Sequence, residues 1–245
     1  MFTEVVLTLV SASTPALPRL PPMGWSSWNA FYCNVHETDV RTNAALLTSL
    51  GLRSKGYSQI NIDDCWNNET RGADGKLRPA LSFPSGMKVL ASDMHAQNFT
   101  FGLYTSQTSK TCAGRAAAYG HEAVDAETYC KWGVDYLKID LCGGDHYPLL
   151  NTSWIKFKEG FSQCDHPIIT SVEYCGIDYP SGDSKVVAAT GVDPVRGCGE
   201  WIAGLANLWR TSSDLQPLWS SVISTAAANN VMASVQKIGV SWVRI

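Results

Sequence analysis

Short apolar segments that end in polar or aromatic residues recur along the chain at nearly constant spacing. They predict buried strands at residues 23–28, 59–64, 101–105, 136–140, 168–174 and 205–210. Residues near the C-terminal ends of these segments are 38, 41, 36, 34 and 36 positions apart. A strand, a helix and two loops need about this length, so the spacing predicts a series of βα units and a parallel sheet.

Helical patterns fill the intervals between the predicted strands. They cover residues 39–55, 87–90, 122–132 and 154–161, and a last helix is expected after Pro217. Repeated right-handed βα units close into a (β/α)8 barrel, the TIM-barrel type of α/β fold. A doubly wound open sheet is the alternative, but no glycine-rich phosphate turn follows the first strand.

The length of the chain limits how many βα units it holds. Eight units at this spacing need roughly 290 residues, whereas residues 23–245 number 223. We therefore expect an incomplete barrel of about six units. The predicted organisation is a leader at 1–22, a partial TIM-barrel catalytic domain at 23–230, and an unassigned, aberrant tail at 231–245.

The charge balance argues against two classes of partner. Lysine and arginine number 19 against 22 acidic residues, for a formal net charge of −3. Without a basic cluster we expect neither nucleic-acid nor membrane-surface binding. No apolar run approaches the length that spans a bilayer, and the oligomeric state stays open.

The cysteines and sequons favour the secretory pathway, with a secreted or vacuolar/lysosomal location. Eight widely spaced cysteines without C-x-x-C suggest structural disulfides, with free buried cysteines as the alternative. Glycosylation sequons begin at Asn68, Asn98 and Asn151. The apolar stretch 5–10 resembles the end of a signal peptide, although Glu4 stands where positive charge is usual; a disordered leader is the alternative.

The fourth predicted strand carries the clearest candidate chemistry. Period-two alternation places Lys138 and Asp140 on one face and Leu137 and Ile139 on the other. In a βα barrel, side chains at this strand end face the mouth, where reactive groups lie. A cation nearby keeps an aspartate ionised, as a nucleophile requires. A buried structural ion pair is the alternative.

Further acids and aromatic residues follow other strands. Asp214 is interpreted either as a second carboxylate near the mouth or as a helix N-cap. Asp63 and Asp64 suit either a divalent metal or vicinal sugar hydroxyls, but few further oxygen ligands lie nearby in the sequence. Aromatic faces near strand ends suit the apolar face of a sugar, although each is equally suited to filling the core. These aromatic residues are Trp25, Trp28, Trp66 and Tyr104.

Several motifs in this order resemble glycoside hydrolase family 27, the α-galactosidases and α-N-acetylgalactosaminidases. They are MGW at 23–25, DDCW at 63–66, KTCAG at 110–114, WGVDYLKID at 132–140 and WRTSSD at 209–214. The resemblance runs from about residue 22 to about residue 230. It implies a retaining exo-glycosidase that hydrolyses terminal α-linked galactose from oligosaccharides or glycoconjugates by double displacement, without metal or organic cofactor.

The resemblance also implies roles for individual residues. Asp140 is expected to be the nucleophile and Asp214 the general acid/base, with their carboxyl groups about 5–5.5 Å apart. Asp63 and Asp64 match the pair that binds the galactose 4- and 6-hydroxyls. Sugar-hydroxyl contacts and pocket walls are implied for Lys138, Arg210, Trp25 and Tyr104.

The resemblance implies two disulfides and leaves other questions open. Cys33–Cys65 and Cys112–Cys142 match family pairs. Cys175 with Cys198, and Cys130 with Cys164, are guesses for the remaining four. Gly176 follows Cys175 where the family reads the sugar's 2-position, so galactose and N-acetylgalactosamine both remain candidates. A catalytically inactive carbohydrate-binding remnant and an α-galactosyl transferase are the alternative functions.

Overall fold

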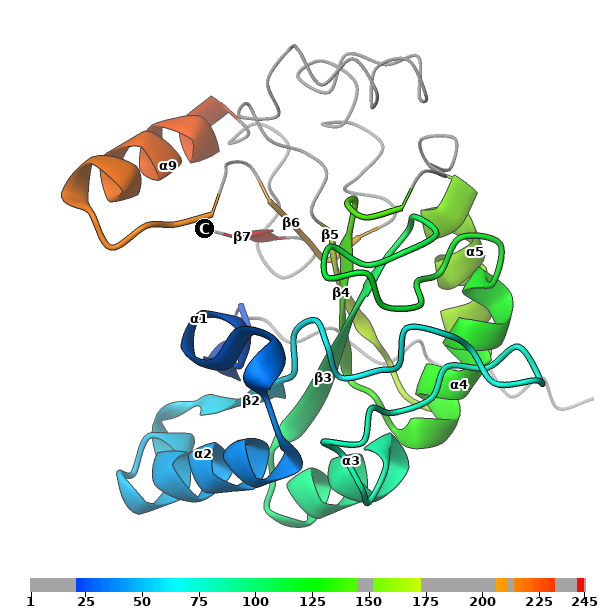
Figure 1. Cartoon of the computed structure of the whole chain (residues 1–245). Helices are drawn as coiled ribbons and strands as arrows, with labels where there is room; N and C mark the ends of the chain where they lie inside the picture. Colours follow the sequence, from blue (N-terminus) through cyan, green and yellow to red (C-terminus); the bar gives the residue numbers. More distant parts are fainter. Residues whose placement is uncertain (1–20, 145–151, 173–205, 211–213, 232–241, 245) are drawn as a thin grey trace, which may run out of the picture.

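A curled parallel sheet is the framework of the chain. The computed structural model describes residues 21–144, 152–172, 206–210, 214–231 and 242–244. Within these ranges seven strands pair in parallel in sequence order (Figure 1). They are β1 (Met23–Ser26), β2 (Tyr57–Asn61), β3 (Thr100–Ser106), β4 (Tyr136–Asp140), β5 (Ile169–Val172), β6 (Leu208–Arg210) and β7 (Trp242–Arg244).

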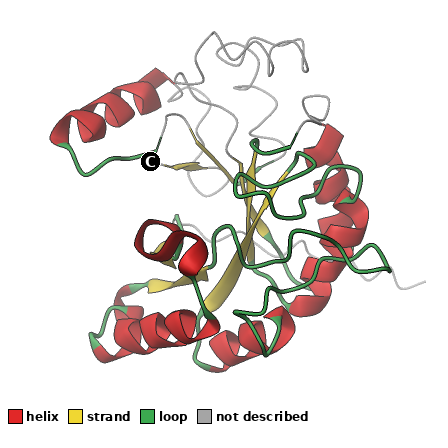
Figure 2. Ribbon diagram, in the orientation of Figure 1, coloured by secondary structure: helices red, strands yellow, loops and turns green. Residues whose placement is uncertain are grey.

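Helices follow the strands along the chain, and α2 to α5 lie along the outside of the curl, whereas α1 lies at the cavity side (Figure 2). They are α1 (Trp28–Phe31), α2 (Glu37–Ser49), α3 (Met87–Ala96), α4 (Glu122–Trp132), α5 (Thr152–Phe161) and α9 (Trp219–Val231). Two short 3₁₀ turns, η1 (Tyr32–Asn34) and η2 (Arg53–Lys55), flank α2. In Figure 1, α2 to α5 follow one another around the sheet, so the structure is part of a (β/α)8 barrel.

The predicted βα alternation is confirmed, with differences at its short elements and at α2, which ends at Ser49 and not at residue 55 as predicted. A strand overlaps each of the six predicted segments, and α4 has the predicted bounds. The four-residue helix α1 was not predicted. Strand β7 lies in the segment left unassigned at 231–245, and its Trp242 pairs with Leu208 of β6. Of the predicted leader at 1–22, residues 1–20 lie outside the described ranges.

Alternation along the strands builds the core between sheet and helices. Ile60, Phe101 and Leu137 point to the helical side and are fully buried. They join apolar residues of α2, α3 and α4 in one cluster that includes Val40, Ala44, Leu90, Met94, Ala126 and Tyr129. Because side chains alternate along a strand, the polar residues between them face the concave side of the sheet.

Among the described residues, three disulfides each join neighbouring parts of the chain. Cys33 is bonded to Cys65, and Cys112 to Cys142, which are the two pairs that the resemblance implies. The third bond joins Cys130 of α4 to Cys164 beyond α5. Cys175 and Cys198, the other guessed pair, lie outside the described residues.

A buried ion pair fastens the long segment between β2 and α3 to helix α4. Arg71 donates to both carboxylate oxygens of Asp125, at 2.6 and 2.7 Å, and to the carbonyl of Ala117 at 2.6 Å. The Asp125 side chain is fully buried, and burial raises its pKa although Arg71 acts to lower it.

No helix in the described ranges is both long and apolar enough to cross a membrane.

Removing the guanidinium of Arg71 is expected to destabilise the fold strongly. In Arg71→Ala the Asp125 carboxylate stays buried without its two N–H donors, which typically costs about 3–5 kcal/mol of unfolding free energy. Urea denaturation at pH 7 measures this loss. The loss is expected to shrink as the pH is lowered, because protonation removes the uncompensated charge.

Lys131→Ala is the matched control, since Lys131 pairs with Glu127 on the exposed face of the same helix. Its unfolding free energy should not differ measurably from that of the unaltered chain. A loss in Arg71→Ala no larger than in this control would show that the buried pair does not hold the segment.

Candidate active site

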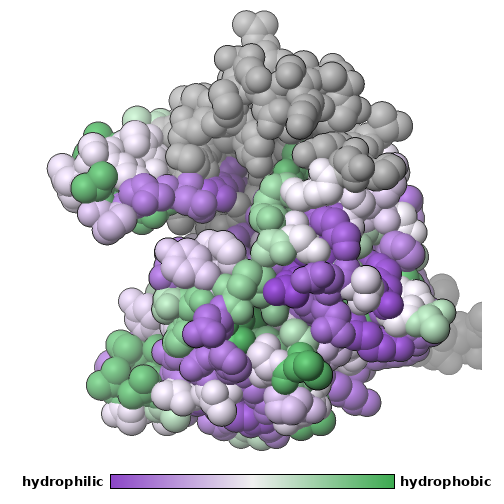
Figure 3. All heavy atoms as spheres, in the orientation of Figure 1, coloured by the Kyte–Doolittle hydropathy of each residue, from purple (hydrophilic) through white to green (hydrophobic). Residues whose placement is uncertain are grey.

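A cavity of about 370 Å³ lies along the concave face of the sheet. Its wall includes five of the eight residues predicted for catalysis and substrate binding: Trp25, Asp63, Tyr104, Lys138 and Asp214. Figure 3 shows a hollow on this side of the molecule, between the segment that leads into α9 and the surface over α1. The chain thus brings residues from β1 to β4 and from beyond β6 around one space.

An ion pair forms part of the cavity wall. The ammonium of Lys138 lies 2.8 Å from Asp63 Oδ2, with the two side chains 14% and 8% exposed. The same nitrogen lies 4.9 Å from the centre of the Tyr104 ring. Ser27, fully buried, accepts a hydrogen bond from the Asp63 N–H at 2.9 Å. The pair therefore offers a fixed acceptor and a fixed donor beside an aromatic face, which suits hydroxyl groups.

Asp140 lies at the end of β4 and is held by hydrogen bonds to both carboxylate oxygens. Oδ1 accepts from the Leu141 N–H at 2.7 Å, and Oδ2 accepts from the Tyr104 hydroxyl at 3.0 Å. Burial and the charge of Asp140 raise the pKa of Tyr104, so its hydroxyl remains a donor at neutral pH. Asp140 is 9% exposed. It does not itself line the cavity, but its hydrogen-bond donor Tyr104 does.

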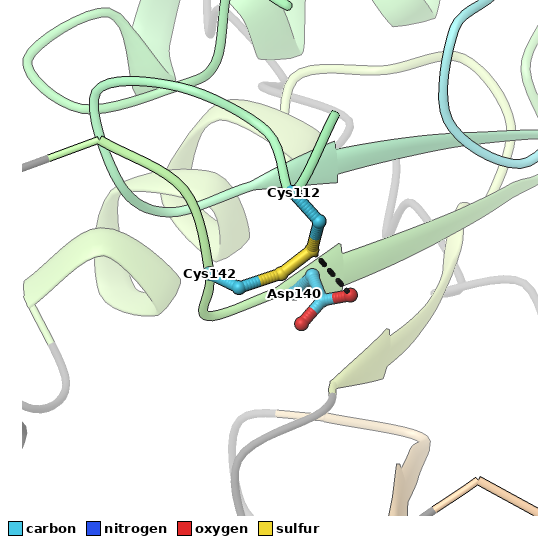
Figure 4. Close-up of side chains that lie close together, drawn as sticks. All are labelled: Cys112, Asp140 and Cys142. Atoms are coloured by element: carbon cyan, nitrogen blue, oxygen red, sulfur yellow. Dashed lines mark hydrogen bonds between the residues drawn. A yellow bond between two sulfur atoms is a disulfide. The ribbon is translucent and has the colours of Figure 1, made fainter. Parts of the chain in front are cut away.

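The Cys112–Cys142 disulfide lies directly against this carboxylate (Figure 4). Cys112 Sγ is 3.5 Å from Asp140 Oδ2 and 2.9 Å from the Tyr104 hydroxyl. Within the described part of the chain, these two cysteines and Asp140 are the one group whose ligand atoms approach closely enough for a metal ion. Their sulfurs are bonded to each other, so they are not thiolate ligands, and we assign no metal there.

Asp214 lies five residues before α9 rather than at its N-cap, so of the two interpretations the structure favours a carboxylate at the cavity. Its Oδ1 accepts a hydrogen bond from Arg210 Nη2 at 2.5 Å. The Asp214 side chain is 74% exposed and that of Arg210 is 18% exposed. The carboxylate is thus at the open rim, oriented by a cation at the end of β6.

Asp64 is placed differently from its neighbour Asp63. It is 1% exposed and does not line the cavity. Its carboxylate accepts from the N–H groups of Cys65 at 2.7 Å and Ala113 at 2.9 Å. In this structure Asp64 therefore anchors the loop that carries Cys112.

Other polar residues of the wall were missed from the sequence. Gln59 and Asn61 line the cavity below Asp63 and are hydrogen-bonded to each other at 2.8 Å. The alternation that singled out Lys138 and Asp140 applies equally to β2 and places these side chains on the Asp63 face. Ser26 and Asn29 also line the wall, but they lie in short elements without a usable period.

Comparison with known proteins shows the family of the chain. A family model described as α-galactosidase A matches residues 20–240. The chain belongs to the α-galactosidase family. Among its relatives, α-galactosidase A of Cellvibrio japonicus is 35% identical over 222 residues, which cover 89% of this chain and 50% of the relative. The α-galactosidase of Cyamopsis tetragonoloba is 34% identical, covering 86% and 47%.

Solved α-galactosidase structures share the fold. The Saccharomyces cerevisiae enzyme superposes with a TM-score of 0.67 at 31% identity, over 84% of this chain and 43% of the enzyme. The chain therefore spans about half the length of the α-galactosidases it matches.

The pH dependence of stability is expected to reveal the burial of Asp64. Burial raises its pKa above the ordinary 3.8, with hydrogen bonds from Ala113 and Thr111 opposing this in part. Its contribution to stability is therefore present below that ordinary value and is lost as the pH rises through the raised one. Relative to Asp64→Asn, the unaltered chain should lose unfolding free energy as the pH rises above the ordinary carboxyl pKa of 3.8.

Asp74→Asn is the control with the opposite sign. The pKa of Asp74 is lowered by its hydrogen bond from Arg78, so here the unaltered chain should gain relative to the variant as the pH rises from acid. Equal slopes for the two variants in paired denaturation series would contradict the assignment.

Proposed function

We propose that this chain carries the catalytic centre of a retaining exo-α-galactosidase, which hydrolyses terminal α-linked galactose. The observation that carries the proposal is the cavity itself. The chain belongs to the α-galactosidase family, and its cavity is lined by the Asp63–Lys138 pair and by Asp214. Tyr104, also in the wall, is hydrogen-bonded to Asp140. A Saccharomyces cerevisiae relative has a structure with raffinose, which supports a galactoside as substrate class.

Substrate recognition is assigned to the cavity wall. Asp63 accepts from, and Lys138 donates to, the hydroxyls that distinguish galactose, while Trp25 and Tyr104 pack against the ring. Asp64 belongs to the proposed hydroxyl-binding pair, although Asp63 has the more direct support because it lines the cavity. Arg210 orients Asp214 through their hydrogen bond, and the proposal also assigns it a contact with a sugar hydroxyl.

The first half-reaction transfers the sugar to Asp140. One Asp140 oxygen attacks the anomeric carbon while the bond from that carbon to the leaving oxygen breaks. Protonated Asp214 donates its proton to that oxygen, which departs as an alcohol. Tyr104, as a permanent donor, stabilises the Asp140 carboxylate before attack and orients it.

The second half-reaction releases galactose. Asp214, now ionised, takes a proton from water as the water oxygen attacks the anomeric carbon, and the bond to Asp140 breaks. Two inversions at one carbon retain the α configuration. A sugar hydroxyl in place of water gives transfer, which shares the first half-reaction.

Substitution of the two aspartates is expected to separate their roles. Asp140→Ala should show no turnover of a chromogenic aryl α-galactoside above buffer. Asp214→Ala should lose roughly 10²- to 10⁴-fold on an alkyl galactoside, and less on the aryl substrate, whose leaving group needs little protonation. Initial rates on both substrates test this, and equal rates for Asp140→Ala and the unaltered chain reject enzymatic turnover.

Galactose-dependent thermal stabilisation distinguishes an enzyme from a binding remnant. Free galactose at 100 times its Kd stabilises a folded protein by about 2.7 kcal/mol. A shift in Tm without turnover would favour a carbohydrate-binding protein. Lys138→Met should abolish the shift, because it removes the donor and leaves Asp63 without its counter-ion.

We also propose that the protein matures in the secretory pathway. Three disulfides and the exposed sequon residues Asn68 and Asn98 support this, while the third sequon, at Asn151, lies outside the described residues. Expressed in a eukaryotic secretory host, the protein should lose mass on enzymatic removal of N-glycans. Asn68→Gln combined with Asn98→Gln should reduce that loss; a single unglycosylated species from the unaltered chain would contradict the proposal.

A further inference from the structure

Two buried hydroxyls face the turn that follows Asp140. Ser106 is the last residue of β3 and Thr108 lies two residues beyond it, and both are 0% exposed. In the β3–β4 ladder Ser106 is the residue paired with Asp140. Neither residue belongs to the cavity wall.

The hydroxyls contact each other and the backbone of the turn. Ser106 Oγ and Thr108 Oγ1 are 2.7 Å apart. Ser106 Oγ lies 2.9 Å from the Cys142 carbonyl oxygen and 3.2 Å from that of Asp140. Thr108 Oγ1 lies 2.8 Å from the Cys142 carbonyl oxygen and 2.7 Å from that of Lys110. The Cys142 N–H donates to Ser106 Oγ at 3.2 Å.

Hydrogen counting shows how tightly the two hydroxyls depend on each other. Each carries one hydrogen, yet together they make four oxygen–oxygen contacts between 2.7 and 2.9 Å. The hydrogens are therefore shared among several acceptors, and such networks lose more than one bond when a member is removed. The pair acts as a unit across the gap between the segment after β3 and the turn after β4.

The link to the carboxylate runs through one planar peptide group. The carbonyl of Asp140 accepts from the Gln107 N–H at 2.9 Å and faces Ser106 Oγ. The N–H of Leu141 belongs to the same peptide and donates to Asp140 Oδ1. Because that group is rigid, rotation of its carbonyl end also moves the N–H that orients the carboxylate.

The disulfide does not replace this restraint. The disulfide joins the side chains of Cys112 and Cys142. Next to it, Gly143 packs closely against the backbone of Thr111, so that a Cβ added to Gly143 would lie 1.9 Å from the Thr111 carbonyl oxygen. These contacts hold the outer part of the turn. The Asp140–Leu141 peptide itself is held by the Gln107 N–H and by Ser106 Oγ, and Thr108 Oγ1 in turn contacts Ser106 Oγ.

We propose that Ser106 and Thr108 are positioning residues for the nucleophile: they fix the Asp140–Leu141 peptide and, through it, the attacking oxygen. The inference rests on the proposed function, in which Asp140 attacks the anomeric carbon. Small displacements of a reacting group, on the order of 1 Å, cost up to about 10²-fold in rate.

The test compares hydroxyl removal with hydroxyl retention in the full chain. Thr108→Val and Ser106→Ala remove one hydroxyl each with little change of shape, and Thr108→Ser retains it. Thr128→Val is the matched control, because it removes a buried threonine hydroxyl that bonds the Val124 carbonyl within α4. Turnover of an aryl α-galactoside, galactose-dependent Tm shifts, and hydrogen exchange of a peptide covering residues 136–144 are measured for each.

We expect Thr108→Val and Ser106→Ala to lower kcat at least tenfold, with KM and the galactose-dependent shift nearly unchanged. Exchange in the 136–144 peptide should accelerate in both. Thr108→Ser and Thr128→Val should keep kcat within about twofold of the unaltered chain. A galactose shift that survives while kcat falls separates positioning from a general loss of structure.

Other results overturn the proposal. They are an unchanged kcat in folded Thr108→Val and Ser106→Ala, equal loss in Thr108→Ser and Thr108→Val, or loss of kcat and galactose binding together. Failure of both hydroxyl-removing variants to fold assigns the pair a structural role only. If the unaltered chain itself shows no turnover, the proposed function fails, and this inference fails with it; turnover that is insensitive to the variants removes this inference alone.

Discussion

The parallel register between β3 and β4 determines the arrangement around the cavity. It pairs Tyr104 with Lys138 and Ser106 with Asp140, so each side chain of β4 has its partner at the same level on β3. A slip by one residue would turn every one of these side chains to the helical face. The register is secured by the apolar residues between them, since Leu103, Leu137 and Ile139 are buried on the opposite face.

Polar groups on the concave side therefore depend on hydrophobic burial on the convex side. The Asp63–Lys138 pair, 75 positions apart, forms because β2 and β4 flank β3. Its partial exposure lets water solvate both charges while no partner is bound, which limits the cost of desolvation. Arg71 and Asp125 meet on the helical side instead, where burial makes their mutual neutralisation essential.

Much of the fold was predictable, because the spacing between successive strand segments and the periodicity of apolar residues both indicate βα units. Helix α4 has the predicted bounds, and its C-cap is Gly133, which adopts the left-handed backbone conformation that favours glycine. Helix α1 and strand β7 could not be predicted from the sequence. Elements of four and three residues are too short to show a periodic pattern of apolar residues, and tertiary contacts specify them.

The candidate site was predictable only in part. Alternation along β4 indicated Lys138 and Asp140, whereas the choice of Asp63 as partner for Lys138 needs the spatial order of three strands. Sequence resemblance treated Asp63 and Asp64 as equivalent, yet consecutive residues beyond a strand point in different directions, and Asp64 bonds the Ala113 N–H. Ser106 and Thr108 gave no signal, because serine and threonine are common at strand ends.

The three disulfides have a consequence for how the chain tolerates backbone cleavage. They span 32, 30 and 34 positions, about one βα unit each, and the intervals 112–142 and 130–164 overlap. A protease nick anywhere within residues 33–65 or 112–164 therefore leaves both fragments covalently attached. Such a nicked protein migrates as one species until a reductant is added, so intact size without reductant is no proof of an unbroken backbone.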